Sequence, residues 1–218
     1  MKIGLLTYNH PHLKTQDVVY RLSLTGSDIT LFAYPWVDKE NFKPLFPHRP
    51  SWCYPFNAFE LSNIFHTDYV KIGNYKQLDD YDIDLFLICG AGIIDYIPKT
   101  PILNAHPGYI PIVRGLDALK WAIFHKTKIG ITLHQITEQV DSSAKIIKRE
   151  EFYPYPGEMF YHFAMRFYQR EIEILVDSIN WDGGYLKTED IYDECFDLPF
   201  RRMPHNYEIL MIKRFGDV

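Results

Sequence analysis

A strand–helix–strand pattern at the amino terminus constrains the fold of this chain more than any other feature. Residues 3–7 form a continuous apolar run bounded by turn residues, which is typical of a strand buried on both faces. Residues 15–24 place apolar side chains at helical spacing, with a helix cap near Thr15, and residues 28–34 predict a second strand. Because neighbouring parallel strands need a crossover helix, this order predicts an α/β fold with a Rossmann-like, mostly parallel twisted sheet and helices on both faces.

The remainder of the chain continues this alternation of strands and helices. Residues 85–89 form the clearest buried strand and end at the turn Gly90-Ala91-Gly92. Further strands are predicted at residues 102–104, 129–136 and 145–152, and further helices at residues 115–124 and 157–179. Residues 35–60 combine several prolines with many aromatic side chains, which favours a long ordered loop packed by aromatic rings. Residues 207–214 fit either a strand or a helix.

Length, charge and cysteine content limit the domain organisation and the partners. A chain of 218 residues with 47% hydrophobic residues can bury one sizeable core, so we expect a domain over residues 1–180 and a short C-terminal extension over residues 181–218 packed on it. The net charge of -5 disfavours a nucleic-acid surface, because phosphate binding needs a concentrated positive field. No apolar run approaches the ~20 residues of a membrane span, and the first residues predict a strand instead of a signal peptide. Scattered cysteines without a Cys-x-x-Cys pair favour a reducing, cytoplasmic location.

The residues best able to carry chemistry follow two of the predicted strands. Asn104 and His106 are two positions apart in an extended segment, so their side chains share one face, and a Pro-Gly turn follows. Asp141 comes 35 residues after His106 (141 − 106), at the end of another apolar run. An amide donor, an imidazole and a carboxylate are the groups needed to move an acyl unit onto an amine. We therefore predict that Asn104, His106 and Asp141 are the catalytic residues.

Three other histidines have plainer interpretations. His134 lies in the middle of a predicted strand, where a hydrogen-bonded structural histidine is the more common role. His10 and His12 have the spacing of a metal-ligand pair, but no carboxylate is close to them in sequence. We therefore expect exposed loop histidines there, and we predict no metal site.

The same two regions carry a family resemblance. The segment from Asn104 to Pro111, NAHPGYIP, followed by Arg114 and a glycine, resembles the Asn-x-His-Pro-x-x-x-Pro signature of folate-dependent formyltransferases. The stretches GITLH, at residues 130–134, and EQVDS, at residues 138–142, resemble the second sequence block of that family. The resemblance covers about residues 80 to 150. Two positions depart from the family pattern, since Gly108 stands where a serine is usual and Ser143 where a glycine is usual.

The resemblance implies an N-formyltransferase that takes its formyl group from N10-formyltetrahydrofolate and uses no metal. In this family the pterin ring of the folate lies in a pocket built mostly from backbone groups. The matching positions of this sequence are Gly90, Ala91, Gly92, Ile93, Ile94, Ile136, Thr137 and Glu138.

The short nucleotide-sugar N-formyltransferases are the members that the chain resembles most, which implies that the formyl acceptor is the amine of a GDP-, dTDP- or UDP-linked amino sugar destined for surface polysaccharide such as the O-antigen of lipopolysaccharide. The extra basic β-domain of the methionyl-tRNA formyltransferases and the regulatory domain of the folate-hydrolysing relatives are not expected in this chain. The predicted substrate contacts are Tyr8, Asn9, His10 and Arg114, with Lys14 and the arginines of residues 201–202 as further cations for a diphosphate.

Two alternatives to this function remain open. The chain could formylate another small amine, such as an aminoacyl group on a carrier, or it could be a folate- or sugar-nucleotide-binding module without turnover. The oligomeric state is also open, with a homodimer as one alternative.

Overall fold

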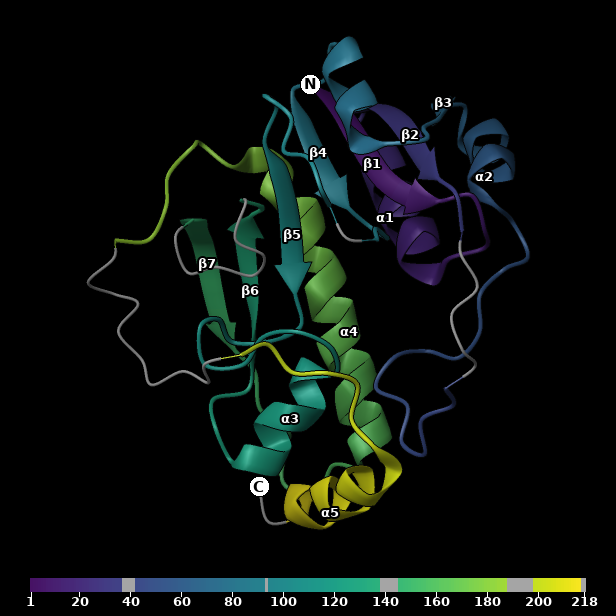
Figure 1. The fold of residues 1–218 in the computed structure, drawn as a ribbon. Coiled ribbons are helices and arrows are strands. Elements are labelled where there is room, and N and C mark those ends of the chain that lie inside the picture. Colours follow the sequence, from purple (N-terminus) through teal and green to yellow (C-terminus); the bar gives the residue numbers. More distant parts are fainter. Residues whose placement is uncertain (37–41, 93, 138–144, 188–197, 217–218) are drawn as a thin grey trace.

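The computed structural model describes residues 1–36, 42–92, 94–137, 145–187 and 198–216. Over these residues the chain forms one sheet of seven strands with helices packed against it (Figure 1). The strands are β1 (Lys2–Tyr8), β2 (Asp28–Tyr34), β3 (Asp68–Lys71), β4 (Leu85–Ile88), β5 (Ile102–His106), β6 (Gly130–Gln135) and β7 (Ile146–Glu151). The α-helices are α1 (Leu13–Ser23), α2 (Ala58–Phe65), α3 (Ala118–His125), α4 (Phe160–Asp177) and α5 (His205–Phe215), and the 3-10 helices are η1 (Tyr75–Asp80) and η3 (Ser178–Asn180).

The strand order β3-β2-β1-β4-β5-β6-β7 makes the sheet doubly wound. From β1 the chain moves outward to β2 and β3, then returns to place β4 and β5 on the other side, and all these neighbours are parallel. In the described part of the sheet, the antiparallel pairs are β5 with β6 and β6 with β7. The predicted mostly parallel α/β sheet is therefore confirmed. The strand order reverses between β1 and β4, which is the position where ligands of such sheets bind, outside the carboxyl ends of the strands.

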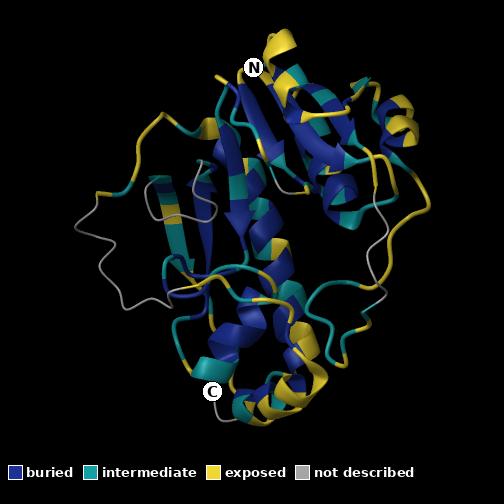
Figure 2. Ribbon diagram, viewed as in Figure 1, coloured by how far each residue is buried: buried dark blue, intermediate teal, exposed yellow. Residues whose placement is uncertain are grey.

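Both faces of the parallel part of the sheet are buried (Figure 2). Ile3 and Leu5 of β1 lie in the main core, together with residues of α1, α2 and α4. Leu6 of the same strand points to the opposite face, where it packs with Phe32 and with Tyr75 of η1 in a second core. Because strand side chains alternate between the two faces, a strand buried on both sides has the continuous apolar run seen in the sequence.

Two predicted helix starts were wrong, for reasons visible in the backbone. The first helix begins at Leu13, so Thr15 lies buried inside the first turn and does not cap it. In the segment before α3, Gly115 and Asp117 have φ angles of 92° and 53°. These left-handed values do not occur within a right-handed helix, so α3 starts only at Ala118.

The loop predicted over residues 35–60 is only partly a loop, and residues 37–41 lie outside the described residues. Residues 42–57 have no regular structure, but α2 begins directly after them. A capping box starts this helix: the Glu60 N–H donates to the Asn57 side chain at 3.0 Å, and the Asn57 N–H donates to the Glu60 carboxylate at 2.8 Å. The sequence carries a signal for this helix, Asn followed three residues later by Glu, yet the sequence prediction contained neither α2 nor the neighbouring strand β3.

The C-terminal segment ends in a helix that packs on the rest of the molecule. Residues 207–214, for which strand and helix were both open, lie within α5. Met203, Met211 and Phe215 are buried in the main core, and the Phe215 ring contacts Phe160 and Phe163 of α4. Within the described residues, no helix is both long enough and apolar enough to cross a bilayer.

Candidate functional site

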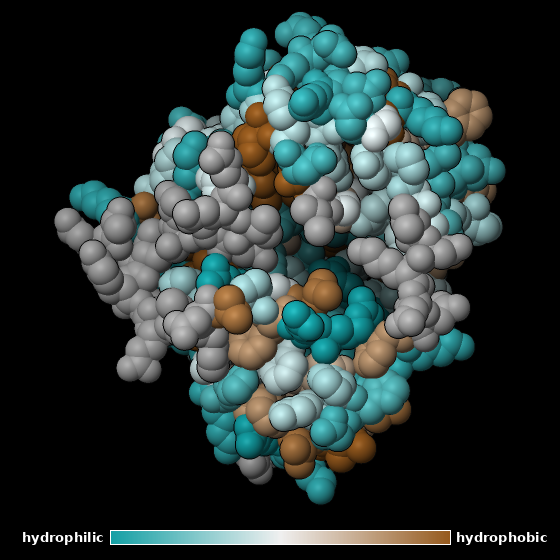
Figure 3. Space-filling model, in the orientation of Figure 1, coloured by the Kyte–Doolittle hydropathy of each residue, from teal (hydrophilic) through white to brown (hydrophobic). Residues whose placement is uncertain are grey.

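A cavity of about 890 Å³ opens at the carboxyl ends of β1, β4 and β5, where the strand order reverses. It is lined by Tyr8 and residues 88–91 and 104–107 at the strand ends, by His12 and Lys14 at the start of α1, by residues 43–44 and 47–51, and by residues 115–117, Glu171 and Arg202. On the face seen in Figure 3 the surface is hollowed near its middle, between the strand ends and the end of the molecule that holds α3 and α5. The lining mixes backbone, cationic and imidazole groups, so the cavity suits a polar, anionic ligand.

Asn104 and His106 lie together on the wall of this cavity. In the antiparallel pairing of β5 with β6, Asn104 is opposite His134 and His106 is opposite Thr132, which places these four side chains on one face. The Asn104 Nδ2 atom is 3.4 Å from His134 Nε2, and the rings of His106 and His134 are perpendicular with centroids 6.3 Å apart. His134 therefore lies beside the predicted catalytic pair, and only 6% of His106 is exposed.

The turn after β5 is held by Thr132. Its hydroxyl accepts a hydrogen bond from the Ile110 N–H at 2.9 Å and donates one to the Gly108 carbonyl at 2.8 Å. A β-carbon on Gly108 would lie 2.6 Å from the Val113 carbonyl oxygen and 2.9 Å from His106 Nε2. A serine at this position would therefore force a backbone shift beside His106, which accounts for the glycine in place of the usual serine.

Asp141, the third predicted catalytic residue, lies outside the described residues, as do Ile93 and Glu138 of the predicted folate contacts. Gly90 and Ala91 line the cavity. The Tyr8 hydroxyl donates a hydrogen bond to the Ala91 carbonyl, which ties the turn after β4 to the end of β1.

The other predicted folate contacts are less close to the cavity. Gly92 is exposed, and a β-carbon there would meet nothing within 4 Å. Ile94, Ile136 and Thr137 are not among the described residues that line the cavity. Ile136 is buried, and Ile94 half-buried, in the second core, and Thr137 is half-buried at the end of the described part of this segment.

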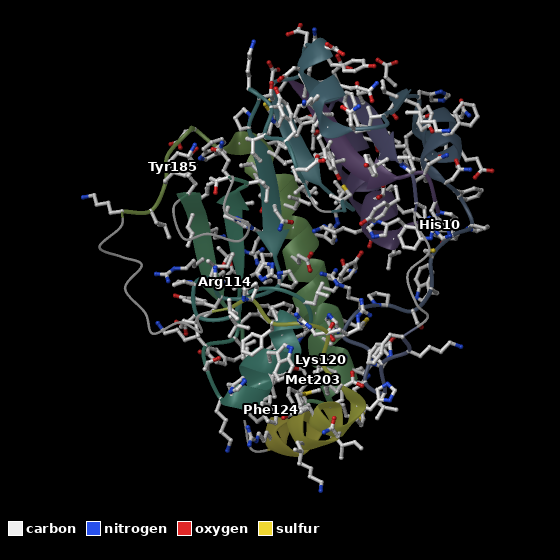
Figure 4. The ribbon with its side chains drawn as sticks, viewed as in Figure 1. His10, Arg114, Lys120, Phe124, Tyr185 and Met203 are labelled. Carbon is white, nitrogen blue, oxygen red and sulfur yellow. The ribbon has the colours of Figure 1, made fainter. Side chains whose placement is uncertain are left out.

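Of the four predicted substrate contacts, Tyr8, Asn9, His10 and Arg114, the structure places only Tyr8 among the described residues of the cavity wall. Lys14 and Arg202, predicted as further cations for a diphosphate, also line the cavity. Asn9 and His10 are exposed on the loop after β1, and the His10 ring stacks on Trp36 with centroids 4.8 Å apart. Figure 4 shows His10 at one edge of the molecule and Arg114 near the turn before α3. The structure thus does not bring Asn9, His10 and Arg114 together.

The cavity wall contains a buried ionic cluster that the sequence did not predict, although one member, Lys14, was predicted as a cation for a diphosphate. Glu171 of α4 is 1% exposed and lies 2.8 Å from both Lys14 Nζ and Arg49 Nη2. Burial favours its neutral form, but the charges of Arg49 and Lys14 outweigh it and lower the pKa of Glu171 to about 2. The cluster therefore carries one net positive charge. Its sequence signal is a glutamate in the apolar stripe of a helix, one turn after Phe167.

Two imidazoles beside this cluster are uncharged at neutral pH. Burial, together with the nearby Lys14 and Arg49 charges, lowers the pKa of His12 to about 4, and burial lowers the pKa of His48 well below its ordinary value. The expectation that His12 is an exposed loop residue was wrong, since it is half-buried with its Nδ1 3.0 Å from Thr15 Oγ1. In the described part of the chain, no three His, Cys, Asp or Glu side chains are grouped so that they could hold a metal ion.

The known proteins to which the chain is similar, in sequence or in structure, include several formyltransferases. No protein-family model matches the chain. A segment of 77 residues is 32% identical to the dTDP-4-amino-4,6-dideoxyglucose formyltransferases of Mycobacterium bovis and Mycobacterium tuberculosis, and it covers 34% of this chain and 32% of theirs. The match thus spans about a third of the length of these curated relatives.

The solved structures that resemble the chain share its fold over most of its length. A 4-N formyltransferase from Francisella tularensis is 18% identical, with a TM-score of 0.55, over 98% of this chain and 87% of that one. A glycinamide ribonucleotide transformylase from Geobacillus kaustophilus is 19% identical, with a TM-score of 0.57, over 84% of this chain and 100% of that one. Since their names indicate different acceptors, the fold alone does not identify an acceptor. The chain therefore has the fold of these formyltransferases, and one segment of it is similar in sequence to dTDP-4-amino-4,6-dideoxyglucose formyltransferases.

Proposed function

We propose that the protein transfers a formyl group from N10-formyltetrahydrofolate to the amine of a nucleotide-linked amino sugar. The observation that carries the proposal is the placement of Asn104 and His106 side by side on the wall of a large cavity at the carboxyl edge of the sheet. An amide donor and an imidazole on one rigid strand meet the main needs of acyl transfer, which are a donor for the developing oxyanion and a group that moves a proton.

Asn104 is the proposed oxyanion donor. A primary amide has two N–H bonds, so Asn104 can donate one to His134 Nε2 and keep the other for the acyl oxygen. A donor of this kind contributes about 3 to 4 kcal/mol in comparable sites. His106 would donate a proton to the leaving nitrogen and regain one, through Asp141, from the attacking amine. Asp141 is the proposed partner that orients His106 and takes up the amine proton.

The turn after β4 is the proposed site for the folate. The folate supplies the activated formyl group, and the chain supplies a narrow backbone turn beside it. A β-carbon on Gly90 would lie 2.8 Å from the Tyr8 ring, so this turn is closely packed on its inner side. Gly92, by contrast, is open on its outer side and allows a flat ring to approach the backbone.

Replacing Gly92 with valine is expected to weaken tetrahydrofolate binding by about 10-fold or more, because the new side chain fills the space next to the backbone. The affinity for a nucleoside diphosphate should stay within about twofold of the wild type. Isothermal titration calorimetry with both ligands tests this. Gly73→Val is the matched control, since Gly73 is an exposed glycine outside the cavity. Equal losses for the two ligands would contradict the placement.

The acceptor is proposed to enter on the cationic side of the cavity. Lys14, Arg49, Lys43 and Arg202 all line this side, and they offer charge-assisted hydrogen bonds to a diphosphate. A remote diphosphate supplies binding energy that positions the amine for attack. The expected product is a formylated sugar nucleotide for surface polysaccharide such as the O-antigen of lipopolysaccharide, made in a reducing cytoplasmic compartment.

A substrate screen tests the function directly. The whole chain is incubated with N10-formyltetrahydrofolate and a panel of GDP-, dTDP- and UDP-linked amino sugars, and products are identified by mass spectrometry. At least one nucleotide-linked sugar should react ~10²-fold faster, as kcat/KM, than the free amino sugar or methionyl-tRNA. If the free amino sugar reacted as fast as every nucleotide-linked sugar, the assignment of a sugar nucleotide as acceptor would be wrong, while formyl transfer itself would be supported. Folate binding without transfer to any amine would indicate a binding module.

A further inference from the structure

The C-terminal segment helps to form the acceptor side of the cavity. Residues 198–204 run past the turn before α3, where the Leu116 N–H donates to the Phe200 carbonyl and the Phe200 N–H donates to the Arg114 carbonyl, both at 2.9 Å. The Met203 N–H donates to the Asp117 carboxylate, also at 2.9 Å. Arg202, within this stretch, lines the cavity. The segment is thus bonded to the cavity wall on both sides of Arg202.

Glu208 of α5 joins this segment to a second part of the wall. Its carboxylate is fully buried, and one oxygen forms an ion pair with Lys120 of α3, which is also fully buried and is labelled in Figure 4. The other oxygen accepts a hydrogen bond from the Leu45 backbone N–H at 2.8 Å. Each carboxylate oxygen thus has a partner: one pairs with Lys120 of α3, and the other accepts from the backbone of the segment that contains residues 43–49.

Residues 43–49 need such anchors because they have no regular secondary structure. The Leu45 side chain is 48% exposed, so its backbone, and not its side chain, attaches this residue to the molecule. A further bond comes from α5, where His205 Nε2 is 2.9 Å from the Lys43 carbonyl oxygen. Phe46 packs against the main core. Lys43, whose carbonyl is one of these anchors, and Arg49, which follows them, both line the cavity.

We propose that Glu208 is a positioning residue for acceptor binding: by holding the Leu45 backbone against α5, it fixes the cationic wall of residues 43–49 facing the acceptor's diphosphate. Glu208 is not among the described residues that line the cavity, so it acts through the residues it holds. The inference rests on the proposed function for the identity of the ligand. If Glu208 contacted Lys120 alone, the pair would have only a structural role. The hydrogen bond to the Leu45 N–H links Glu208 to the segment of residues 43–49, which lines the cavity.

Two double variants separate these roles. In both, Lys120→Met removes the cation, so that no unpaired charge is left in the core. Combined with Glu208→Gln, one amide oxygen remains to accept from the Leu45 N–H. Combined with Glu208→Leu, the side chain has similar size and no acceptor, and the Leu45 N–H loses its partner. Because Phe46 still packs on the core, both variants are expected to fold, which thermal unfolding checks.

We expect the two variants to differ in the mobility of residues 42–49 and in nucleotide affinity, and to have the same folate affinity. Backbone hydrogen exchange of the peptide covering residues 42–49 should be faster in the Leu variant than in the Gln variant. The Kd for UDP, dTDP or GDP, measured by calorimetry, should rise about 10-fold in the Leu variant, which corresponds to loss of one buried hydrogen bond. The Kd for tetrahydrofolate should be equal in both. With a reactive acceptor, KM should rise and kcat should stay.

Equal exchange in the two variants would overturn the inference, because Glu208 would then act only through Lys120. Faster exchange with unchanged nucleotide affinity would overturn it as well, since the wall would not govern binding. Failure of the proposed function has a different signature, namely no formyl transfer by the wild-type chain to any acceptor. If the wild type also bound none of the three diphosphates, the link from Glu208 to acceptor binding would be wrong.

Discussion

Replacing His106 with alanine is expected to lower kcat for formyl transfer by ~10²-fold or more while the fold is retained. His106 lies at the end of β5 with its ring on the cavity wall and 6% of its surface exposed. No other imidazole of β5 or β6 can take over easily, since His134 is 1% exposed and is not among the residues that line the cavity. Steady-state kinetics at saturating concentrations of both substrates measure the effect.

The matched control for this variant is His162→Ala, since His162 is exposed on α4 and is not among the residues that line the cavity. Its kcat should remain within about twofold of the wild type. Asn104→Ala should resemble His106→Ala in the size of its loss, because an oxyanion donor typically contributes 10²-fold or more. A kcat close to normal in His106→Ala, with a folded protein by circular dichroism, would sink the proposed chemistry.

The predicted fold could be obtained from the sequence because the buried strands carry their own signal. β1 and β4 are buried on both faces, so residues 3–6 and 85–88 carry no polar side chain. α4 is long and has a clear apolar stripe, and its predicted range of 157–179 differs from the observed one by only a few residues. Elements of this kind are specified locally, and their order then restricts the topology.

Short elements and boundaries were harder to predict, because tertiary contacts decide them. β3 has only four residues and is half-buried, so it has no long apolar run. The start of α3 depends on the left-handed backbone of Asp117, whose carboxylate accepts from the distant Met203 N–H. No local pattern around Asp117 announces a partner 86 positions away.

In the candidate site, too, residues on one strand could be predicted from the sequence, whereas groups from distant segments could not. Asn104 and His106 could be paired from sequence because both lie on one strand, two residues apart. Lys14 was among the cations predicted for a diphosphate, but its cluster with Arg49 and Glu171 could not be predicted, because the three residues come from distant segments and meet only in the fold. For the same reason His12 could not be distinguished from an exposed histidine: its burial depends on the strands and segments packed around it.

Replacing Glu171 with glutamine is the second change expected to have a large effect, and it acts on stability. The substitution leaves Lys14 and Arg49 in the cavity wall without their shared counter-charge. Breaking a buried ion pair costs about 3 to 5 kcal/mol, and we expect the lower end, about 3 kcal/mol, because the Arg49 side chain is 37% exposed and remains partly solvated. Glu173→Gln is the matched control on the same helix, since Glu173 pairs with Arg170 at a half-buried, solvent-accessible position and the change should cost less than about 1 kcal/mol.

The pH dependence of unfolding gives this prediction a distinctive signature. The pKa of Glu171 is lowered to about 2 in the folded protein, from an ordinary value near 4.5, so the unfolded chain binds a proton at higher pH than the folded one does. The stabilisation by its charge is therefore fully present above about pH 4.5 and is lost as the pH falls towards 2. Urea unfolding of the wild type, Glu171→Gln and Glu173→Gln at about pH 7, 4 and 3 should show the gap between wild type and Glu171→Gln narrowing as the pH falls. Two results would contradict this prediction. Glu171→Gln could lose no more stability than Glu173→Gln at neutral pH, or the difference in unfolding free energy between wild type and Glu171→Gln could stay constant down to about pH 3. In either case the charge of Glu171 would not stabilise the cluster with Lys14 and Arg49.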